Sequence, residues 1–189
     1  AHVEAGLRSY NRRMPEEINR VVTDHLSSLL FCPTETSVDN LAREGITQAV
    51  YLVGDVMYDA LLSNAQRAEE KSRILEQLRL QPKPYFLATV HRAENTDDPR
   101  RLAVIVKAFE MISDIFTVVW PVHPRTRKVL ESCGLQRNAE SLCVLDPVSY
   151  LDMLSLEKGA KAVLTDSGGV QKEAYWLQVP CVTLRRESE

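Results

Sequence analysis

Short apolar runs alternate with longer amphipathic segments along this chain of 189 residues. The apolar runs predict strands, at His2–Ala5, Leu29–Cys32, Ala49–Val53, Tyr85–Val90, Thr117–Pro121, Leu142–Leu145, Ala162–Thr165 and Cys181–Leu184. The longer segments predict helices, at Glu16–His25, Thr36–Glu44, Tyr58–Leu80, Pro99–Ile112, Arg125–Ser132, Tyr150–Glu157 and Gly169–Leu177. Strands separated by single helices indicate βαβ units, and therefore an α/β fold with parallel sheets covered on both faces.

A composition change in the middle of the chain predicts two units. The charged stretch from Gln66 to Arg79 has no strand character, and a proline-rich break at Pro82 and Pro84 follows it. We place the boundary between residues 54 and 55, with the long helix in the second unit. The chain starts without an initiator Met and stops just after a predicted strand, so we expect it to be part of a longer protein.

Overall composition narrows the class of partner. The apolar fraction of 44% and the charged fraction of 26% are typical of a soluble globular protein. A net charge of -3 gives no electrostatic reason to expect nucleic acid or an anionic membrane as partner. No apolar run is long enough to span a bilayer. The four cysteines lack metal-ligand spacing, so we expect reduced thiols in a cytoplasmic protein and no metal site.

Polar and charged residues end nearly every predicted strand. They are Glu4, Thr34, Asp55, His91, Arg92, His123, Asp146, Asp166, Ser167 and Arg185. Ligands of open parallel sheets bind beyond the carboxyl ends of the strands. These residues are therefore the candidates for a binding or catalytic site.

The segment Asp166-Ser167-Gly168-Gly169 predicts a phosphate site, because it joins a buried strand to the start of a helix. Glu173 lies four residues after Gly169, on the same helix face, and can reach hydroxyl groups beside a bound phosphate. The alternative is a simple glycine turn followed by an exposed Glu. The segment is neither a Gly-x-Gly-x-x-Gly fingerprint nor a P-loop, which argues against dinucleotide binding and ATP hydrolysis.

For the remaining candidate residues, spacing alone leaves both a functional and a structural interpretation open. His91 and Arg92 follow a strand and can assist a leaving phosphate, or His91 can simply cap the next helix. Glu16 and Arg20 are spaced for an ion pair on one helix face, and with Glu4 they can form a two-carboxylate proton-transfer site. Ordinary chemistry at a helix start explains Glu16 equally well. His123, between two prolines, is a ligand contact or a surface imidazole.

Taken together, several segments resemble the non-hydrolysing UDP-N-acetylglucosamine 2-epimerases. The resemblance covers the whole chain, with the motifs in the right order and spacing. The segments that carry it are His2-Val3-Glu4-Ala5-Gly6-Leu7-Arg8, Pro15-Glu16-Glu17-Ile18-Asn19-Arg20, Pro33-Thr34-Glu35, His91-Arg92-x-Glu94-Asn95, Pro121-Val122-His123-Pro124 and Asp166-Ser167-Gly168-Gly169-x-Gln171-x-Glu173-Ala174.

The resemblance implies a fold of the glycosyltransferase-B type, with two Rossmann-like domains. On this basis residues 1–54 are the C-terminal part of the first domain, and residues 55–189 are most of the UDP-binding second domain. It also implies a homodimer and a site for UDP-N-acetylhexosamine. The diphosphate would contact Ser167, Gly168, Gly169, His91 and Arg185, and Glu173 would hold the ribose. Glu4, Glu16 and Arg20 would act at the sugar. Arg92 and His123 match positions that touch a second, regulatory UDP-sugar in some bacterial members.

The implied reaction interconverts UDP-N-acetylglucosamine and UDP-N-acetylmannosamine without a cofactor. A base removes the C2 proton while UDP leaves C1, and UDP re-adds to the glycal after protonation of the other face. The alternatives are a hydrolysing 2-epimerase that releases UDP and N-acetylmannosamine, a glycosyltransferase, and a non-catalytic nucleotide-sugar-binding module.

Two departures from the family pattern bear on these expectations. The family's N-terminal portion, with a further candidate acid/base Asp, and its C-terminal helix are absent, so we expect residues 1–189 alone to be inactive. Relatives often have Gln and an aromatic residue where this chain has Val148 and Met153, which leaves the uracil contact open.

Overall fold

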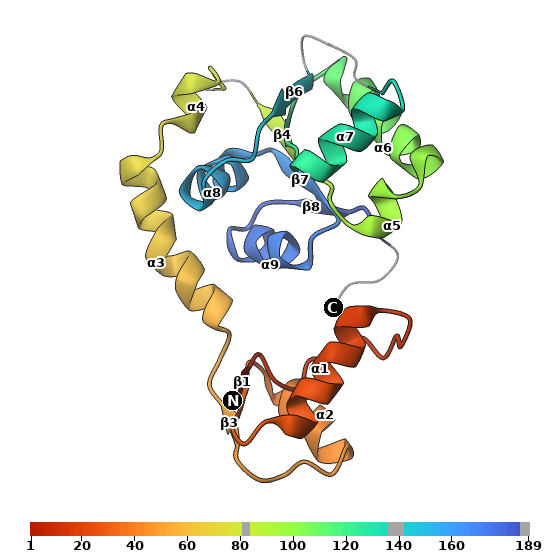
Figure 1. The fold of residues 1–189 in the computed structure, drawn as a ribbon. Coiled ribbons are helices and arrows are strands. Elements are labelled where there is room, and N and C mark those ends of the chain that lie inside the picture. The colour runs from red at the N-terminus through yellow and green to blue at the C-terminus, as the bar shows by residue number, and fades with distance from the viewer. Residues whose placement is uncertain (81–83, 136–141, 186–189) are drawn as a thin grey trace. The chain divides into compact units, whose positions relative to one another are not determined.

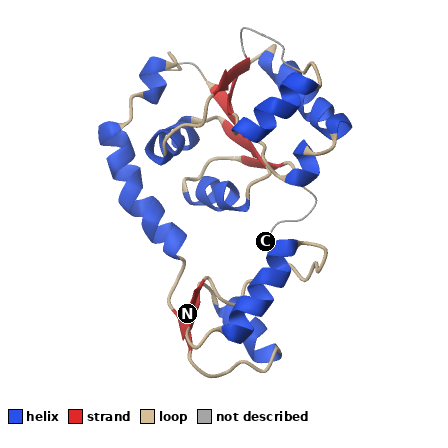
Figure 2. Cartoon of the chain, viewed as in Figure 1, coloured by secondary structure: helices blue, strands red, loops and turns tan. Residues whose placement is uncertain are grey.

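The structure is a computed structural model that describes residues 1–80, 84–135 and 142–185. These residues form two compact units, residues 1–61 and the residues from Leu62 onward, and each unit is described by itself. Figures 1 and 2 show helices and short strands in both. The division falls inside one helix, α3 (Val56–Lys71). The domain boundary between residues 54 and 55 stays a prediction.

The first unit contains a three-stranded parallel sheet. Its strands pair in the order β1 (His2–Val3), β2 (Leu30–Cys32) and β3 (Val50–Leu52). Two helices connect them, α1 (Pro15–Leu26) and α2 (Glu35–Arg43). A small core lies between the sheet and the helices, made of Ala5, Leu30, Cys32 and Leu41.

Local signals explain where these two helices begin. In α1, Pro15 occupies the first turn together with Glu16 and Glu17, where a fixed φ and negative charge both suit a helix start. In α2, the side chain of Thr34 caps the helix by accepting a hydrogen bond from the amide of Ser37 at 3.2 Å.

The second unit contains a five-stranded sheet, and every strand pair in it is parallel. In spatial order the strands are β6 (Leu142–Leu145), β5 (Thr117–Pro121), β4 (Tyr85–Thr89), β7 (Ala162–Thr165) and β8 (Cys181–Thr183). The chain proceeds from β4 outward to β6, then returns to the other side of β4 to form β7 and β8. The strand order therefore reverses between β4 and β7, and this is the switch point at which such sheets bind ligands.

Helices cover both faces of this sheet (Figures 1 and 2). Besides the end of α3, the helices of the unit are α4 (Ile74–Gln77), α5 (Ala93–Thr96), α6 (Pro99–Ser113), α7 (Pro124–Ser132), α8 (Tyr150–Gly159) and α9 (Gly168–Trp176). Leu102 and Phe109 of α6 pack with Trp120 on one face, whereas Leu156 of α8 and Ala174 of α9 pack with strand residues on the other.

Alternation along the strands explains the two cores. Neighbours such as Leu87 and Ala88, or Val118 and Val119, are all fully buried but belong to opposite clusters. Burying a side chain such as Phe109, which meets Trp120 edge-on at 5.2 Å between ring centroids, contributes about 2 to 3 kcal/mol. The α/β fold with parallel sheets that the sequence predicts is confirmed.

Three elements differ from the predictions. Strand β1 stops at Val3 and not at Ala5, because Glu4 takes a left-handed φ of 66° that no strand continues. The long helix breaks into α3 and α4, because the Ser72 hydroxyl donates to Asp152 at 2.6 Å and accepts from the amide of Ile74 at 3.3 Å. The short helix α5 was not predicted. Within the residues that the structure describes, no helix has the length and apolarity needed to cross a membrane.

Candidate functional site

The turn between β7 and α9 has the features of an anion site. Ser167 is the N-cap of α9, and its hydroxyl accepts a hydrogen bond from the amide of Val170 at 3.4 Å. Gly168 and Gly169 form the start of the helix, where the first amide groups have no acceptor within the helix and carry partial positive charge. Because neither glycine has a side chain, a phosphate can approach these amides closely.

The loop after β4 is joined to this turn by one buried carboxylate. Asp166, fully buried, accepts hydrogen bonds from the amide of His91 at 3.1 Å and the amide of Arg92 at 3.0 Å. It also accepts from Nδ2 of Asn95 at 2.8 Å. The ring Nδ1 of His91 lies 3.5 Å from Asp166 Oδ1, while half of the His91 side chain stays exposed. The two loops at the switch point are thereby held in contact, with His91 beside the start of α9.

The end of β8 is fixed to the same loop. Nδ2 of Asn95 donates a second hydrogen bond, to the carbonyl of Leu184 at 3.0 Å. Arg185 comes next and is half-buried. Hydroxyl groups complete this edge of the sheet, because Thr89 and Thr165 Oγ1 atoms lie 2.5 Å apart and the amide of Ser167 donates to Thr165 at 2.9 Å. The ends of β4, β7 and β8 therefore meet around the predicted diphosphate contacts.

Glu173 is buried on α9, one turn into the helix, and is not the exposed residue of the alternative interpretation. It accepts a hydrogen bond from the Tyr150 hydroxyl at 2.8 Å. Burial raises the pKa of Glu173, and the hydrogen bond partly offsets this rise. Burial and the same bond also raise the pKa of Tyr150, so the phenol keeps its proton and remains a donor.

A second buried carboxyl group lies close to Glu173. Glu157 of α8 has no exposed surface, and neither of its oxygens has a hydrogen-bond partner among the described residues. Burial, and secondarily the charge of Glu173, raises the pKa of Glu157 to about 9. At neutral pH this side chain is therefore a neutral acid. Sequence reasoning missed Glu157. The available signal was its spacing, because Glu157 lies three residues after the apolar Leu154 and therefore on the same face of the helix.

His91 and His123 line one cavity of about 370 Å³ at the ends of β4, β5 and β6. His123 is the N-cap of α7, and its Nδ1 accepts from the amide of Arg125 at 3.2 Å. Val148 and Met153 form part of the apolar wall. Arg92 is half-buried at the N-cap of α5. The structure thus brings His91, His123, Val148 and Met153 together.

The remaining predicted residues belong to the first unit. Glu4 is half-buried in the turn after β1, and Glu16 is exposed in the first turn of α1. Arg20 lies 3.8 Å from Glu17, three residues earlier on α1. Sequence reasoning gave Glu17 only a place in the first turn of this helix, but its side chain is buried and accepts hydrogen bonds from the amides of Ser9 at 2.8 Å and Tyr10 at 2.9 Å. Glu17 therefore holds the loop that precedes α1.

Comparison with known proteins now decides the family. A sequence profile described as UDP-N-acetylglucosamine 2-epimerase matches residues 1–189. The chain belongs to this family. This confirms the resemblance carried by the motifs, at the level of the 2-epimerase family as a whole.

Curated relatives support the assignment to the 2-epimerase family. A UDP-N-acetylglucosamine 2-epimerase homolog of Methanococcus maripaludis is 56% identical over 193 residues, which cover the whole chain and 54% of that protein. The UDP-2,3-diacetamido-2,3-dideoxy-D-glucuronate 2-epimerase of Pseudomonas aeruginosa is 51% identical, over the whole chain and 52% of its own length. The chain thus spans about half the length of the curated relatives it matches.

A solved 2-epimerase has the same fold. The crystal structure of the Methanocaldococcus jannaschii UDP-GlcNAc 2-epimerase in complex with UDP-GlcNAc and UDP matches with a TM-score of 0.89 and 46% identity, over the whole chain and 54% of that structure. The glycosyltransferase-B type of fold implied by the resemblance is therefore confirmed.

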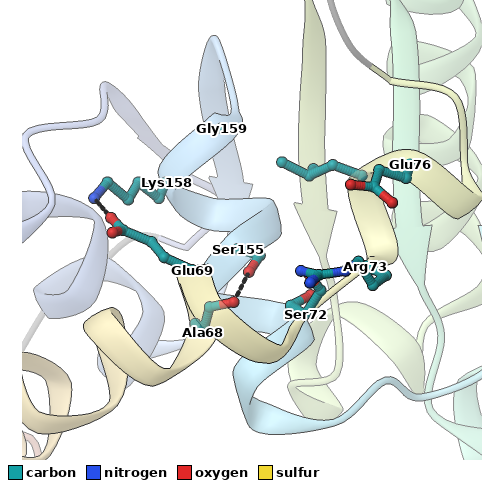
Figure 3. Close-up of a pocket in the computed structure, with 9 residues that line it drawn as sticks. Ala68, Glu69, Ser72, Arg73, Glu76, Ser155, Lys158 and Gly159 are labelled. Atoms are coloured by element: carbon teal, nitrogen blue, oxygen red, sulfur yellow. Dashed lines mark hydrogen bonds and ion pairs between the residues drawn. The ribbon is translucent and has the colours of Figure 1, made fainter.

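Another cavity of the second unit lies away from the 2-epimerase motifs (Figure 3). It has a volume of about 340 Å³, and its walls come from the ends of α3, α4 and α8. Lys158 and Glu69 form an ion pair at its rim, and the Ser155 hydroxyl donates to the carbonyl of Ala68 at 3.5 Å. Gly159 in its wall lies against Tyr85, the first residue of β4. The cavity is therefore at the amino ends of the strands, opposite to the edge where parallel sheets bind ligands.

Proposed function

We propose that the complete protein containing this chain interconverts UDP-N-acetylglucosamine and UDP-N-acetylmannosamine. UDP is eliminated from C1 and re-added to a glycal intermediate. The observation that carries the proposal is the helix start at the β4/β7 switch point, with the buried Glu173 one turn further on. Membership of the 2-epimerase family supports the same conclusion.

In this proposal the diphosphate binds the Ser167 hydroxyl and the amides of Gly168 and Gly169, flanked by His91 and Arg185. The helix start supplies partial positive charge where negative charge develops on the leaving UDP. With Nδ1 facing Asp166, the imidazolium form of His91 can donate a hydrogen bond from Nε2 to the diphosphate.

Glu173 holds the ribose hydroxyls in this proposal. One of its oxygens already accepts from Tyr150, which leaves the other for the sugar. A hydrogen bond to a charged acceptor contributes about 1.5 to 3 kcal/mol.

Glu4, Glu16 and Arg20 of the first unit act at the hexose. One carboxylate takes the C2 proton, the C1–O bond breaks with its electron pair passing to UDP, and a C1=C2 double bond forms. The reverse addition restores the C1–O bond after a proton reaches the other face of C2. Two carboxylates on opposite faces invert the centre without a redox cofactor or a metal.

Solvent deuterium tests the reaction in the complete protein. UDP-N-acetylglucosamine is incubated in D₂O, and the products are examined by NMR and mass spectrometry. Deuterium at C2 of intact UDP-sugar of both configurations supports the proposal. Free N-acetylmannosamine with UDP identifies a hydrolysing 2-epimerase instead. The absence of label identifies a glycosyltransferase or a nucleotide-sugar-binding module.

A second substrate is favoured by one specific observation. The Pseudomonas aeruginosa relative named for UDP-2,3-diacetamido-2,3-dideoxy-D-glucuronate is 51% identical. This lies above the 44% and 48% of two relatives named UDP-N-acetylglucosamine 2-epimerase and below the 56% of the relative named as a homolog of that enzyme. The two substrates differ by an acetamido group at C3 and a carboxylate at C6. A ratio of kcat/KM values measured in one mixture identifies the preferred sugar.

Regulation, assembly and location are further parts of the proposal. Arg92 and His123 contact a second, regulatory UDP-sugar, and the complete protein is a homodimer. The resemblance to the family supports both statements. The described cysteines form no disulfide, which is compatible with a cytoplasmic enzyme that makes precursors of surface polysaccharides.

A further inference from the structure

A buried carboxylate in the first unit contacts both ends of the turn that carries Glu4. Asp24 of α1 has no exposed side-chain surface. Its Oδ1 lies 2.5 Å from Nδ1 of His2, and its Oδ2 accepts from the amide of Gly6 at 3.1 Å. Because an ionised carboxylate only accepts, Nδ1 of His2 carries the proton. Asp24 therefore binds the residue two before Glu4 and the residue two after it.

The turn needs such a restraint because Glu4 has an unusual backbone conformation. Its φ of 66° lies in the left-handed region, which residues with a side chain rarely adopt. A backbone of this kind persists only where the surrounding structure over-determines it, and such residues gather at functional sites.

Other contacts act on the same turn. The amide of Ala5 donates to the carbonyl of Phe31 at 3.0 Å, and Nδ2 of Asn40 donates to the carbonyl of Gly6 at 3.0 Å. Gly6 itself has a φ of 78°, and a Cβ there would collide with the carbonyl oxygen of Ser37. The turn is thus held against β2 and α2, and the Asp24 side chain adds a contact on each side of Glu4.

Asp24 does not stand alone, because its charge is balanced inside the unit. Nη1 of Arg8 lies 2.7 Å from Oδ2 of Asp24, and the Arg8 side chain is 1% exposed. Arg8 also donates to both oxygens of Glu44, at 2.7 Å from Nε and 2.8 Å from Nη2. Glu44 touches neither His2 nor Gly6 in any of these contacts, so it balances Arg8 without restraining the turn.

We propose that Asp24 is a positioning residue of the epimerase, which fixes the turn from His2 to Gly6 so that Glu4 meets the hexose in one orientation. This inference rests on the proposed role of Glu4. It concerns how the carboxylate is held, and Asp24 itself contacts no substrate. Since a small misplacement of a reacting group costs about 100-fold in rate, the restraint acts on kcat.

The test is Asp24→Asn in the complete protein. The Asn side chain keeps one acceptor oxygen but loses the charge that is paired with Arg8, so its hold on the turn weakens. We expect the Gly6 amide to exchange with solvent about tenfold faster, and kcat to fall by about tenfold or more. We expect KM and the Kd for UDP to change less than about threefold, because the diphosphate contacts belong to the other unit.

Glu44→Gln is the matched control, since it removes a carboxylate from the same network. We expect it to lower the melting temperature while kcat stays within about twofold of wild type. His2→Ala is the second variant, in case Asp24→Asn does not fold. It removes only the Oδ1 contact at a side chain that is 19% exposed, and it should lower kcat by a smaller factor.

Two outcomes would overturn the inference. One is unchanged exchange of the Gly6 amide in Asp24→Asn or, where that variant does not fold, wild-type kcat in His2→Ala. The other is faster exchange with kcat equal to that of Glu44→Gln. A wild-type protein that incorporates no deuterium at C2 contradicts the proposed function instead, and exchange at Gly6 still reports whether Asp24 holds the turn.

Discussion

Buried carboxyl groups dominate the chemistry of this chain at the scale of single residues. Asp24, Glu157, Asp166 and Glu173 are all less than one-tenth exposed, and their partners differ completely. Asp24 and Asp166 accept several hydrogen bonds, Glu173 accepts one from Tyr150, and Glu157 has no partner within the described part of the chain. Each environment gives a different expectation.

Glu173→Gln should weaken the discrimination between UDP and 2′-deoxy-UDP. If the carboxylate holds the ribose hydroxyls, the wild-type protein prefers UDP by about 10- to 100-fold, and the variant by less than about fivefold. Isothermal titration of both nucleotides measures the two ratios. Tyr150→Phe is the control, because it removes the neighbouring donor and keeps the charge. Equal preference in wild type and Glu173→Gln contradicts the ribose role.

Glu157 should make the protein less stable as the pH rises. Its pKa is about 9 when folded, well above the usual value of 4.5, so the folded state binds the proton more tightly. Stability from this group is complete below about pH 4.5 and is lost progressively as the pH approaches 9.

Replacing Glu157 by Gln should therefore raise the free energy of unfolding at pH 8 by about 2 kcal/mol and change it little at pH 5. Urea denaturation at the two pH values measures the difference. Glu69→Gln, at an exposed carboxylate paired with Lys158, should show no such dependence on pH. If the free energy of unfolding of Glu157→Gln depends on pH as it does in the wild type, Glu157 is not a neutral acid in the folded protein.

At the scale of elements, the turns between strands and helices decide what the site can do. Asp166 lies in the β7–α9 turn and accepts hydrogen bonds from the backbone amides of His91 and Arg92 in the β4–α5 loop. Its carboxylate therefore joins the loop to the turn. An Asn in its place presents an NH₂ group to amides that also donate.

We expect Asp166→Asn to weaken UDP binding by about tenfold or more and to speed exchange of the His91 and Arg92 amides. Titration calorimetry and exchange measured by NMR provide the two readouts. Asp97→Asn serves for comparison, since Asp97 pairs with Arg125 at the surface and should leave both quantities near wild type. Slower or unchanged exchange at His91 would exclude this role of Asp166.

Two glycines of the first unit allow the cost of a steric clash to be distinguished from the cost of backbone strain. Gly6 and Gly45 have φ angles of 78° and 82°, but only at Gly6 would a Cβ meet other atoms within 4 Å. Gly45→Ala should cost about 1 to 2 kcal/mol, which is strain alone. Gly6→Ala should cost at least about 3 kcal/mol, because β1 and α2 must also move apart.

Melting temperatures of the two variants measure this difference. A Gly6→Ala protein as stable as Gly45→Ala would mean that the turn can shift away from Ser37 at little cost.

Sequence reasoning succeeded for elements and was weaker for the polar interior. Each predicted strand is present, and the cause is clearest where the apolar run is buried throughout, as at β7. The break of α3 and the helix α5 were missed, since each depends on a partner distant in the sequence. The burial of Glu157 was missed because a carboxyl group is rarely buried without a partner. Ser72 bonds Asp152, and Asn95 of α5 bonds Asp166. Such pairings leave no periodic pattern in the chain.

At the scale of the whole molecule, the chain spans about half the length of its relatives and consists of two compact units. The proposed reaction needs groups from both, together with family segments that the sequence does not contain. We therefore expect purified residues 1–189 to bind UDP but to give no deuterium at C2, whereas the complete protein gives both. Calorimetry and the D₂O assay compare the two. Label incorporated by residues 1–189 alone would show that these residues suffice for catalysis.

The strand order β6-β5-β4-β7-β8 also bears on how the proposed nucleotide site forms during synthesis. His91 and Asp166 touch although 75 positions separate them in the chain. Pairing of β4 with β7 must close that long loop first, which is slow because of its entropy. On the ribosome, we expect β4 through β6 to emerge as an unfinished sheet without affinity for UDP, because the proposed diphosphate contacts at the start of α9 come later in the chain. Binding of the nucleotide to nascent chains of increasing length would thus begin only once β7 and α9 have left the exit tunnel, so UDP can report when β7 and α9 have joined the sheet.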